Sequence, residues 1–186
     1  MVKTASSMIP LGTQAPDFCL LDPCSGQEKS LHELKGELAT VIMFICNHCP
    51  YVKHITSEIA QLARDYQSKG IRFVAINAND VDSYPEDAPD KMVEEVNTQG
   101  YSFPYLYDES QQVAKAYKAE CTPDFFVFDK DLACVYRGQL DDSRPGNGIA
   151  VTGKDLRLAL DCVIAGNEVS VEQIPSIGCN IKWKSS

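Results

Sequence analysis

The feature that most constrains this fold is a Cys-x-x-Cys pair placed between an apolar run and a helical pattern. The run over 38–45 is continuous and largely aliphatic or β-branched, and it has the length of a strand buried on both faces. Beyond Pro50, apolar residues recur at helical spacing as far as Tyr66, with a polar face beside them. We therefore expect a central strand that leads through Cys46 and Cys49 into an amphipathic helix.

Pro50 suits the first turn of that helix, because a backbone N–H there has no intrahelical partner. Cys46 is accordingly expected at or just before the helix N-terminus, where unpaired N–H groups and the helix dipole favour a thiolate. Cys49 follows one turn later and is able to close an intramolecular disulfide. The spacing predicts redox chemistry in which Cys46 is a nucleophile of lowered pKa.

Composition restricts the class of protein. A chain of 186 residues with 44% hydrophobic and 23% charged residues is expected to form a single domain over 1–186. The formal net charge of −9 argues against nonspecific binding to nucleic acid or to an anionic membrane. The N-terminus carries no apolar signal segment and no later run has the length of a membrane-spanning helix, so we expect a cytoplasmic protein.

Cysteine is abundant, but disulfide scaffolds are typical of short secreted chains, so most of these residues are expected to be buried, reduced thiols. Cys19 and Cys24 flank the turn of a predicted β-hairpin within 10–37, where they form either a regulatory disulfide or two ordinary thiols. A closed zinc site needs a second ligand pair beside Cys46 and Cys49, so neither a metal nor a cofactor is predicted. The remaining cysteines are Cys121, Cys134, Cys162 and Cys179.

The rest of the chain alternates strands and helices. A second buried strand over 71–77 follows the first helix, which predicts parallel pairing of the two strands. The acidic segment 79–90 is too polar for a core, and it is either a solvated loop or a specificity loop beside the strand ends. A helix, a short strand and a further helix precede a hairpin over 121–138, and the last helix ends at Gly166. The tail over 166–186 is expected to pack on the domain.

This order of elements resembles the thioredoxin fold, and the segment 12–18 with its spacing to the cysteine pair resembles the peroxiredoxin-like (alkyl hydroperoxide reductase/thiol-specific antioxidant) branch. The resemblance implies an α/β fold with a central mixed β-sheet flanked by helices, an N-terminal β-hairpin extension and a C-terminal tail. Motifs in the same order resemble a group of bacterial and plant thioredoxin-family proteins. They are Cys46-Asn47-His48-Cys49-Pro50-Tyr51-Val52, Asn79-Asp80 with Tyr84-Pro85-Glu86-Asp87, Thr122-Pro123-Asp124-Phe125-Phe126, Ser143-Arg144-Pro145-Gly146 and Gly178-Cys179-Asn180-Ile181-Lys182-Trp183-Lys184.

The resemblance also implies roles for individual residues. It makes Cys46 the attacking thiol and Cys49 the resolving thiol. It makes Pro123 a cis-proline opposite them, which exposes the backbone of Thr122 for pairing with an extended substrate.

The insert between the cysteines is Asn47-His48, and both residues are assigned a supporting role. His48 departs from the Gly-Pro insert of thioredoxin and matches the Pro-His insert of strongly oxidising disulfide donors. A cation there would stabilise a thiolate and make this protein more oxidising than thioredoxin, whereas an exposed histidine would have no electrostatic role. Thioredoxin has a buried proton-accepting acid six residues before its first cysteine, and Thr40 occupies that position here. Another group, or water, must therefore accept the proton of the resolving thiol.

Two reactions fit these residues. The leading hypothesis is thiol–disulfide exchange with protein or small-molecule disulfides. The alternative is a thiol peroxidase that forms a sulfenic acid. Peroxiredoxins place the reactive cysteine before Pro and three residues after Thr or Ser. Cys49-Pro50 meets the first condition, but Cys46 occupies the Thr position and Ile42 stands where the motif has Pro.

Three further residues are candidates for the site. Arg144 would assist a peroxidatic thiolate if its loop reaches the site, and otherwise is a solvated charge. Cys179 would be a third resolving thiol if the tail folds back over the helix start, and Cys121 directly precedes the Thr-Pro pair. The reductant, with thioredoxin and glutathione as candidates, and the oligomeric state are left open. A noncatalytic redox sensor or a chaperone-like protein is the remaining class.

Overall fold

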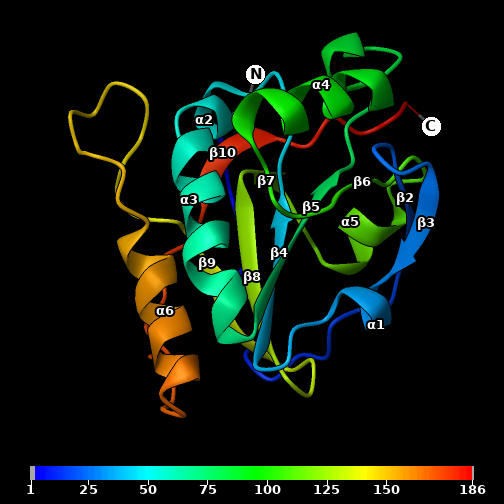
Figure 1. Ribbon diagram of the computed structural model, residues 1–186. Helices are drawn as coiled ribbons and strands as arrows, with labels where there is room; N and C mark the ends of the chain where they lie inside the picture. The colour runs from blue at the N-terminus through cyan, green and yellow to red at the C-terminus, as the bar shows by residue number, and fades with distance from the viewer. Residues whose placement is uncertain (1–2, 186) are drawn as a thin grey trace.

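A mixed β-sheet with helices on both faces forms the centre of the structure, a computed structural model that describes residues 3–185 (Figure 1). The strands in this range are β1 (Lys3–Ala5), β2 (Cys19–Asp22), β3 (Gln27–Ser30), β4 (Ala39–Phe44), β5 (Ile71–Asn77), β6 (Tyr105–Tyr107), β7 (Cys121–Thr122), β8 (Asp124–Asp129), β9 (Cys134–Gly138) and β10 (Ile177–Asn180). Seven of them pair in the order β3-β2-β6-β5-β4-β8-β9. The other three form a smaller sheet in the order β1-β10-β7.

Helices cover the two faces of the larger sheet. They are α1 (Leu31–Leu34), α2 (Pro50–Lys53), α3 (Thr56–Tyr66), α4 (Pro89–Gln99), α5 (Gln112–Ala116) and α6 (Lys154–Ile164), with 3-10 turns η1 (Gln67–Lys69) and η2 (Pro85–Asp87). In Figure 1, α3 and α6 lie on one side of the sheet and α1 and α5 on the other. Within residues 3–185, no helix is long and apolar enough to span a bilayer.

β4 is the central strand, and its residues alternate between two hydrophobic clusters. Val41 and Met43 belong to the cluster that includes the buried side of α3. Ile42 and Phe44 belong to the opposite cluster, where the Phe44 ring lies 5.6 Å from the ring of Tyr117. β4 pairs in parallel with β5 and antiparallel with β8, so the predicted parallel pairing of the first two long strands is confirmed. Burial on both faces fixes the position at which the chain leaves β4 toward the cysteine pair.

The predicted N-terminal hairpin consists of β2 and β3, and it joins the sheet edge through β6. Cys19 opens β2 opposite Ser30, whereas Cys24 lies in the turn beyond the far end of that strand. A strand rises about 3.3 Å per residue. The hairpin therefore separates the two cysteines by more than the Cα distance of about 4.4–6.8 Å that a disulfide allows. The suggested regulatory disulfide between Cys19 and Cys24 is wrong for this structure.

The helix predicted after Pro50 is divided into α2 and α3, and the break falls at Ile55, whose φ is −117° and ψ is 2°. Pro50 takes the first helical position of α2, as predicted, and the N-cap residue is therefore Cys49. Cys46 lies earlier, in the irregular connection after β4. Of the two expected places, at the helix N-terminus or just before it, Cys46 takes the second, three residues before the N-cap Cys49.

β10 comes from the tail over 166–186 and is inserted between β1 and β7. Cys179 lies opposite Thr122 in this pairing. Gly178 permits the close approach, because a Cβ at this position would lie 2.0 Å from the Thr122 carbonyl oxygen. The last strand of the chain is thereby held against the segment that precedes Pro123.

Candidate active site

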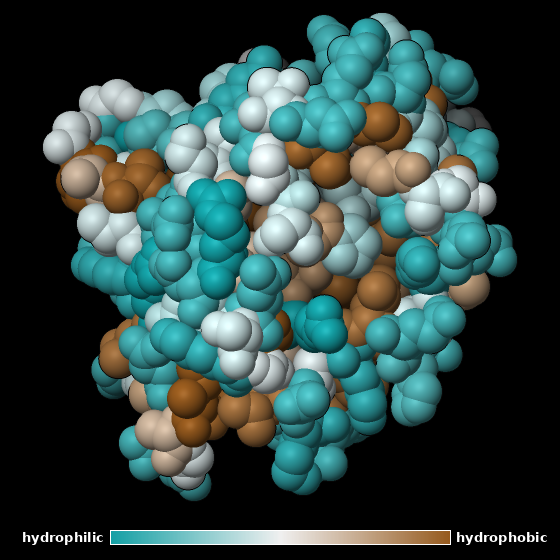
Figure 2. Space-filling model, in the orientation of Figure 1, coloured by the Kyte–Doolittle hydropathy of each residue, from teal (hydrophilic) through white to brown (hydrophobic). Residues whose placement is uncertain are grey.

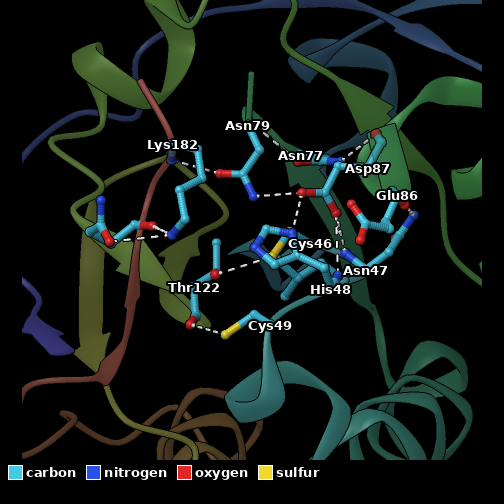
Figure 3. Close-up of polar contacts among 12 residues, drawn as sticks. Cys46, Asn47, His48, Cys49, Asn77, Asn79, Glu86, Asp87, Thr122 and Lys182 are labelled. Carbon is cyan, nitrogen blue, oxygen red and sulfur yellow. Dashed lines mark hydrogen bonds and ion pairs between the residues drawn. The ribbon is translucent and has the colours of Figure 1, made fainter. Parts of the chain in front are cut away.

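Cys46, Cys49, Thr122 and Pro123 come together where the chain leaves β4 and meets β7. The Thr122–Pro123 peptide bond is cis, as the resemblance implied. Cys46 Sγ lies 3.3 Å from Thr122 Oγ1, and Cys49 Sγ lies 3.2 Å from the Thr122 carbonyl oxygen, which accepts when Cys49 is protonated (Figure 3). Both cysteines are buried. All eight cysteines, each among the described residues, are reduced thiols in this structure.

The two thiols hydrogen-bond to each other, and their pKa values shift in opposite directions. The hydrogen bond from Cys46 does most to lower the pKa of Cys49, which falls to about 4 although burial opposes the change. The thiol of Cys179 and the backbone amides of Val52 and Cys179 lower it further. Burial raises the pKa of Cys46 well above its ordinary value, and the hydrogen bond to Cys49 and the negative charge of Asp87 add to this. The reduced pair therefore holds one thiolate, on Cys49, and Cys46 keeps the shared proton.

The predicted lowered pKa of Cys46 is consequently wrong for the reduced structure. Cys49, at the N-cap of α2, receives hydrogen bonds from Cys46, Cys179 and the backbone of Val52, although the Thr122 carbonyl oxygen also lies 3.2 Å away. Cys46 has the Thr122 hydroxyl as a donor, but the carboxylate of Asp87 is also its neighbour. A thiolate forms on the sulfur that receives more donors.

His48 lies beside Cys46 and is bound to a buried carboxylate. Its Nδ1 is 2.6 Å from Asp87 Oδ2, and its ring stacks on Tyr84 with a centroid distance of 4.9 Å. Cys46 Sγ, a ring nitrogen of His48 and a carboxylate oxygen of Asp87 all lie within 4.8 Å of one another. Only 12% of the His48 side chain is exposed, so the alternative of an exposed histidine is excluded. A protonated imidazole in this position offsets the charge of Asp87 next to Cys46.

Asp87 is the site residue that the sequence analysis did not single out. It is fully buried, and Oδ1 accepts hydrogen bonds from the backbone N–H groups of Asn47 at 2.7 Å and His48 at 3.3 Å. Oδ2 accepts from Asn79 Nδ2 at 2.8 Å (Figure 3). Burial by itself would raise the pKa of Asp87, but the hydrogen bonds from His48 and Asn79 hold it below its usual value. Asp87 is therefore an ionised carboxylate inside the protein.

The prediction that segment 79–90 is too polar for the core is wrong at these positions. Asn79 and Asp87 are both buried, and each has its polar atoms satisfied by neighbours in the site. The signal that was available is the Tyr84-Pro85-Glu86-Asp87 motif, which accompanied the cysteine motif in the resemblance.

Asn47 holds the connection between β4 and α2 in place. Its Nδ2 donates to the carbonyl oxygen of Glu86 at 2.9 Å, and its Oδ1 accepts from the Tyr105 hydroxyl at 3.0 Å. On the other side of the site, the backbone N–H of Lys182 donates to Asn79 Oδ1 at 2.8 Å. These contacts join β6, the segment after β5 and the tail around the cysteine pair. Figure 3 shows those that involve Glu86, Asn79 and Lys182.

Arg144 is engaged in its own loop. Its guanidinium donates to the carbonyl oxygens of Asp141 and Ser143 and to Gln139 Oε1. Among the contacts of the described residues, none joins this guanidinium to a thiol. Arg144 lines a small hollow beside Pro123, but its hydrogen bonds indicate a role in shaping the loop rather than in stabilising a thiolate.

The two other candidate cysteines differ in position. Cys121 Sγ is 3.6 Å from the carbonyl oxygen of Pro123, and burial raises its pKa strongly, so it is a core thiol. Cys179 contacts Cys49 by a side-chain hydrogen bond, and burial raises its pKa to about 12. The tail therefore does bring a third sulfur to the pair.

The backbone of Thr122 is not open to a substrate. β10 pairs with it, and Thr122 is buried with 3% of its surface exposed. The expectation of an exposed strand edge before the cis-proline is wrong here, because the tail occupies that edge.

The side chains of Cys46, His48 and Asp87 lie close enough together to hold a metal ion. The carboxylate oxygens of Asp87, however, already accept four hydrogen bonds from Asn47, His48 and Asn79. A ligand set whose acceptor is committed in this way fits a hydrogen-bonded network better than a metal site.

The family profile described as AhpC/TSA matches residues 11–137, which include both cysteines and the cis-proline. The chain belongs to the AhpC/TSA family. The match ends at residue 137, so β10, the strand that carries Cys179, lies outside it.

Similar proteins place this AhpC/TSA chain among thioredoxin-like structures. It is 30% identical over 138 residues to thiol-disulfide oxidoreductase ResA of Halalkalibacterium halodurans, covering 73% of each chain. It is 59% identical to an uncharacterized conserved protein from Geobacillus kaustophilus, whose crystal structure matches with a TM-score of 0.98 over 100% of this chain and 98% of that one. The thioredoxin domain of a thiol-disulfide oxidoreductase from Bacteroides vulgatus matches at 16% identity with a TM-score of 0.60, covering 74% and 91% of the two chains. The predicted thioredoxin-like fold is confirmed.

The assignment of the thiolate to Cys49 is testable by ultraviolet titration of the reduced protein. We expect one thiolate to persist down to about pH 4, which is the pKa of Cys49. Cys46→Ala removes its main donor and shifts this transition upward, toward the ordinary value of 9.0. Cys49→Ala abolishes it, and Cys162→Ala on α6 leaves it unchanged. A low-pH thiolate that survives in Cys49→Ala and disappears in Cys46→Ala would reverse the assignment.

Proposed function

We propose that this protein is a thiol–disulfide oxidoreductase that works through the Cys46 and Cys49 dithiol. The observation that carries the proposal is the hydrogen-bonded pair of thiols, which shares one proton beside Thr122 and the cis-proline Pro123. A shared proton makes one sulfur a thiolate at neutral pH and leaves the other in contact to close a disulfide. The name of the ResA relative as a thiol-disulfide oxidoreductase supports the same reaction.

In the reductive direction Cys46 attacks one sulfur of a substrate disulfide while its proton moves to Cys49 along their hydrogen bond. The substrate S–S bond breaks as the bond to Cys46 forms, and the first substrate sulfur leaves as a thiolate that takes a proton from solvent. Cys49 then attacks Cys46 Sγ, which expels the second substrate sulfur with the proton from Cys49. The pair thus supplies two electrons and one proton, and a Cys46–Cys49 disulfide remains.

The supporting residues fit this sequence of steps. Negative charge on Asp87 opposes a thiolate on Cys46, and His48 Nδ1 is hydrogen-bonded to that carboxylate at 2.6 Å. The pair His48–Asp87 is a positioning element, since neither residue exchanges electrons. The low pKa of Cys49 stabilises the reduced form, which supports a protein more oxidising than thioredoxin.

The test is the reduction of insulin disulfides with dithiothreitol as electron donor. Cys46→Ser is expected to fall to the rate of dithiothreitol alone, because no sulfur remains to attack. Cys49→Ser is expected to accumulate a mixed disulfide with the substrate, because no resolving thiol remains. Cys162→Ser, on α6, serves as the matched control and keeps the wild-type rate. Wild-type activity in Cys46→Ser would refute the proposal.

A peroxidase is the second candidate, and one observation favours it. Cys49 has a pKa of about 4 and precedes Pro50, as a peroxidatic cysteine would. Its thiolate would attack a peroxide oxygen, break the O–O bond and form a sulfenic acid, which Cys46 would condense to a disulfide with loss of water. The same variants are therefore assayed for hydrogen peroxide consumption and for sulfenic acid trapping. Fast peroxide-dependent sulfenylation of Cys49, with negligible insulin reduction, would favour this candidate over the first.

A further inference from the structure

Cys49 has a second sulfur neighbour besides Cys46. The thiol of Cys179 hydrogen-bonds to Cys49. The backbone N–H of Cys179 also stabilises the thiolate of Cys49. All three cysteines belong to one buried cluster. Figure 1 shows β10, which carries Cys179, passing directly beside α2, at whose N-cap Cys49 lies.

The backbone holds Cys179 in this position by two independent constraints. Its strand is paired on both sides, with Cys179 opposite Lys3 in β1 and opposite Thr122 in β7. Gly178 has no Cβ, which would otherwise lie 2.0 Å from the Thr122 carbonyl oxygen, the atom that contacts Cys49 Sγ. The sulfur of Cys179 thus belongs to a strand that is paired on both sides. This strand occupies the edge of β7 at which the resemblance implied that an extended substrate would pair.

We propose that Cys179 is a third redox-active thiol and that the oxidised protein interconverts between a Cys46–Cys49 and a Cys49–Cys179 disulfide. This proposal rests on the proposed function, which forms the first disulfide. Among the described thiols, Cys49 is the one that contacts both of the others, so it is the sulfur common to the two bonds.

The interconversion is an internal exchange and needs no added oxidant. Cys179 attacks Cys49 Sγ, so that a Cys49–Cys179 bond forms while the Cys46–Cys49 bond breaks. Cys46 leaves as a thiolate and takes the proton that Cys179 releases. The protein remains oxidised by two electrons in both forms, but Cys46 is again a thiol in the second. Burial raises the pKa of Cys179 to about 12, so the exchange requires this proton transfer.

Cys121 is also near the site, but proximity alone does not place a thiol in contact with Cys49. It lies next to Thr122 in the chain, yet its thiol points at the carbonyl oxygens of Pro123 and Ser176, at 3.6 and 4.0 Å. It is therefore an internal control for accidental oxidation of buried cysteines.

The test is disulfide mapping of the purified full chain in a buffer of oxidised and reduced glutathione, quenched with acid before alkylation and digestion. Cleavage after glutamate separates Cys162 from Cys179 at Glu168 and Glu172. Wild type is expected to yield both linked forms. Cys46→Ser is expected to lose two alkylatable thiols and to link Cys49 to Cys179, and Cys179→Ser to yield only the Cys46–Cys49 bond. Cys121 is expected to stay alkylatable throughout.

Full alkylation of Cys49 and Cys179 in Cys46→Ser, with the Cys46–Cys49 bond formed in wild type, would overturn this inference and leave the proposed function standing. Inactive wild type in the insulin assay would refute the proposed function, whereas the mapping of Cys46→Ser reports on the Cys49–Cys179 bond regardless of that activity. A circular dichroism spectrum matching wild type shows that each variant is folded.

Discussion

Gly178→Ala is expected to lower the free energy of unfolding by about 3 kcal/mol, the upper end of the usual cost of forcing an extra group into a packed site. The added Cβ would lie 2.0 Å from the carbonyl oxygen and 2.5 Å from the carbonyl carbon of Thr122. These are backbone atoms, which cannot rotate away as a side chain would. β10 must therefore move off β7. Urea denaturation measures the loss.

The matched control is Gly100→Ala at the end of α4. Gly100 has a φ of +65°, but nothing lies within 4 Å of an added Cβ. This substitution is expected to cost about 1 kcal/mol through backbone conformation alone. An equal decrease in the free energy of unfolding in the two variants would show that a Cβ at position 178 can be accommodated beside Thr122. A Gly178→Ala protein that also loses its Cys49–Cys179 bond would connect the strand position to the third thiol.

Asp87→Ala is expected to destabilise the protein by about 3 kcal/mol at neutral pH, because each buried donor left without an acceptor costs about 1–3 kcal/mol. The change leaves the backbone N–H groups of Asn47 and His48 and the amide of Asn79 without their acceptor. Glu86→Ala is the control, since this neighbouring side chain is exposed, and it is expected to change stability by less than about 0.5 kcal/mol.

The cost of Asp87→Ala should depend on pH. The pKa of Asp87 in the folded protein lies below its ordinary value of 3.8, so the unfolded chain binds this proton more readily. Its stabilising contribution is complete above the ordinary value and is lost as the pH falls through the lower, folded value. The difference between wild type and Asp87→Ala in urea should therefore shrink in acid. A difference that stays constant down to the lowest pH at which wild type is folded would show that Asp87 acts without its charge.

Local sequence patterns were sufficient to predict the elements that are determined by residues adjacent in the sequence. The apolar run before Cys46 predicts β4, and Pro50 predicts a helix start, because strand burial and helix geometry are local properties. The cis bond at Pro123 came from resemblance, since a Thr-Pro pair alone reads as a turn.

The pKa values of Cys49 and Asp87 could not be predicted from local sequence patterns. The pKa of Cys49 depends on Cys179, which is far from it in the sequence. The ionisation of Asp87 depends on hydrogen bonds from Asn79, from His48 and from the backbone of Asn47. An acidic segment is solvated in most proteins, and the composition of 79–90 does not show that Asp80 and Asp87 are buried. Tertiary contacts therefore decided which thiol ionises.

The pairing of β10 with β7 also governs which molecules can reach the cysteines. An extended segment of another protein that is to pair with Thr122 has to displace β10, which is a competitor tethered to the same chain. Tethering by a short flexible linker gives a competitor an effective concentration on the order of millimolar. A partner that pairs with Thr122 would therefore bind more weakly than it would to an open strand, because binding would include the cost of detaching β10. The C-terminal strand would thus disfavour extended partners that cannot meet this cost, before any sulfur reacts.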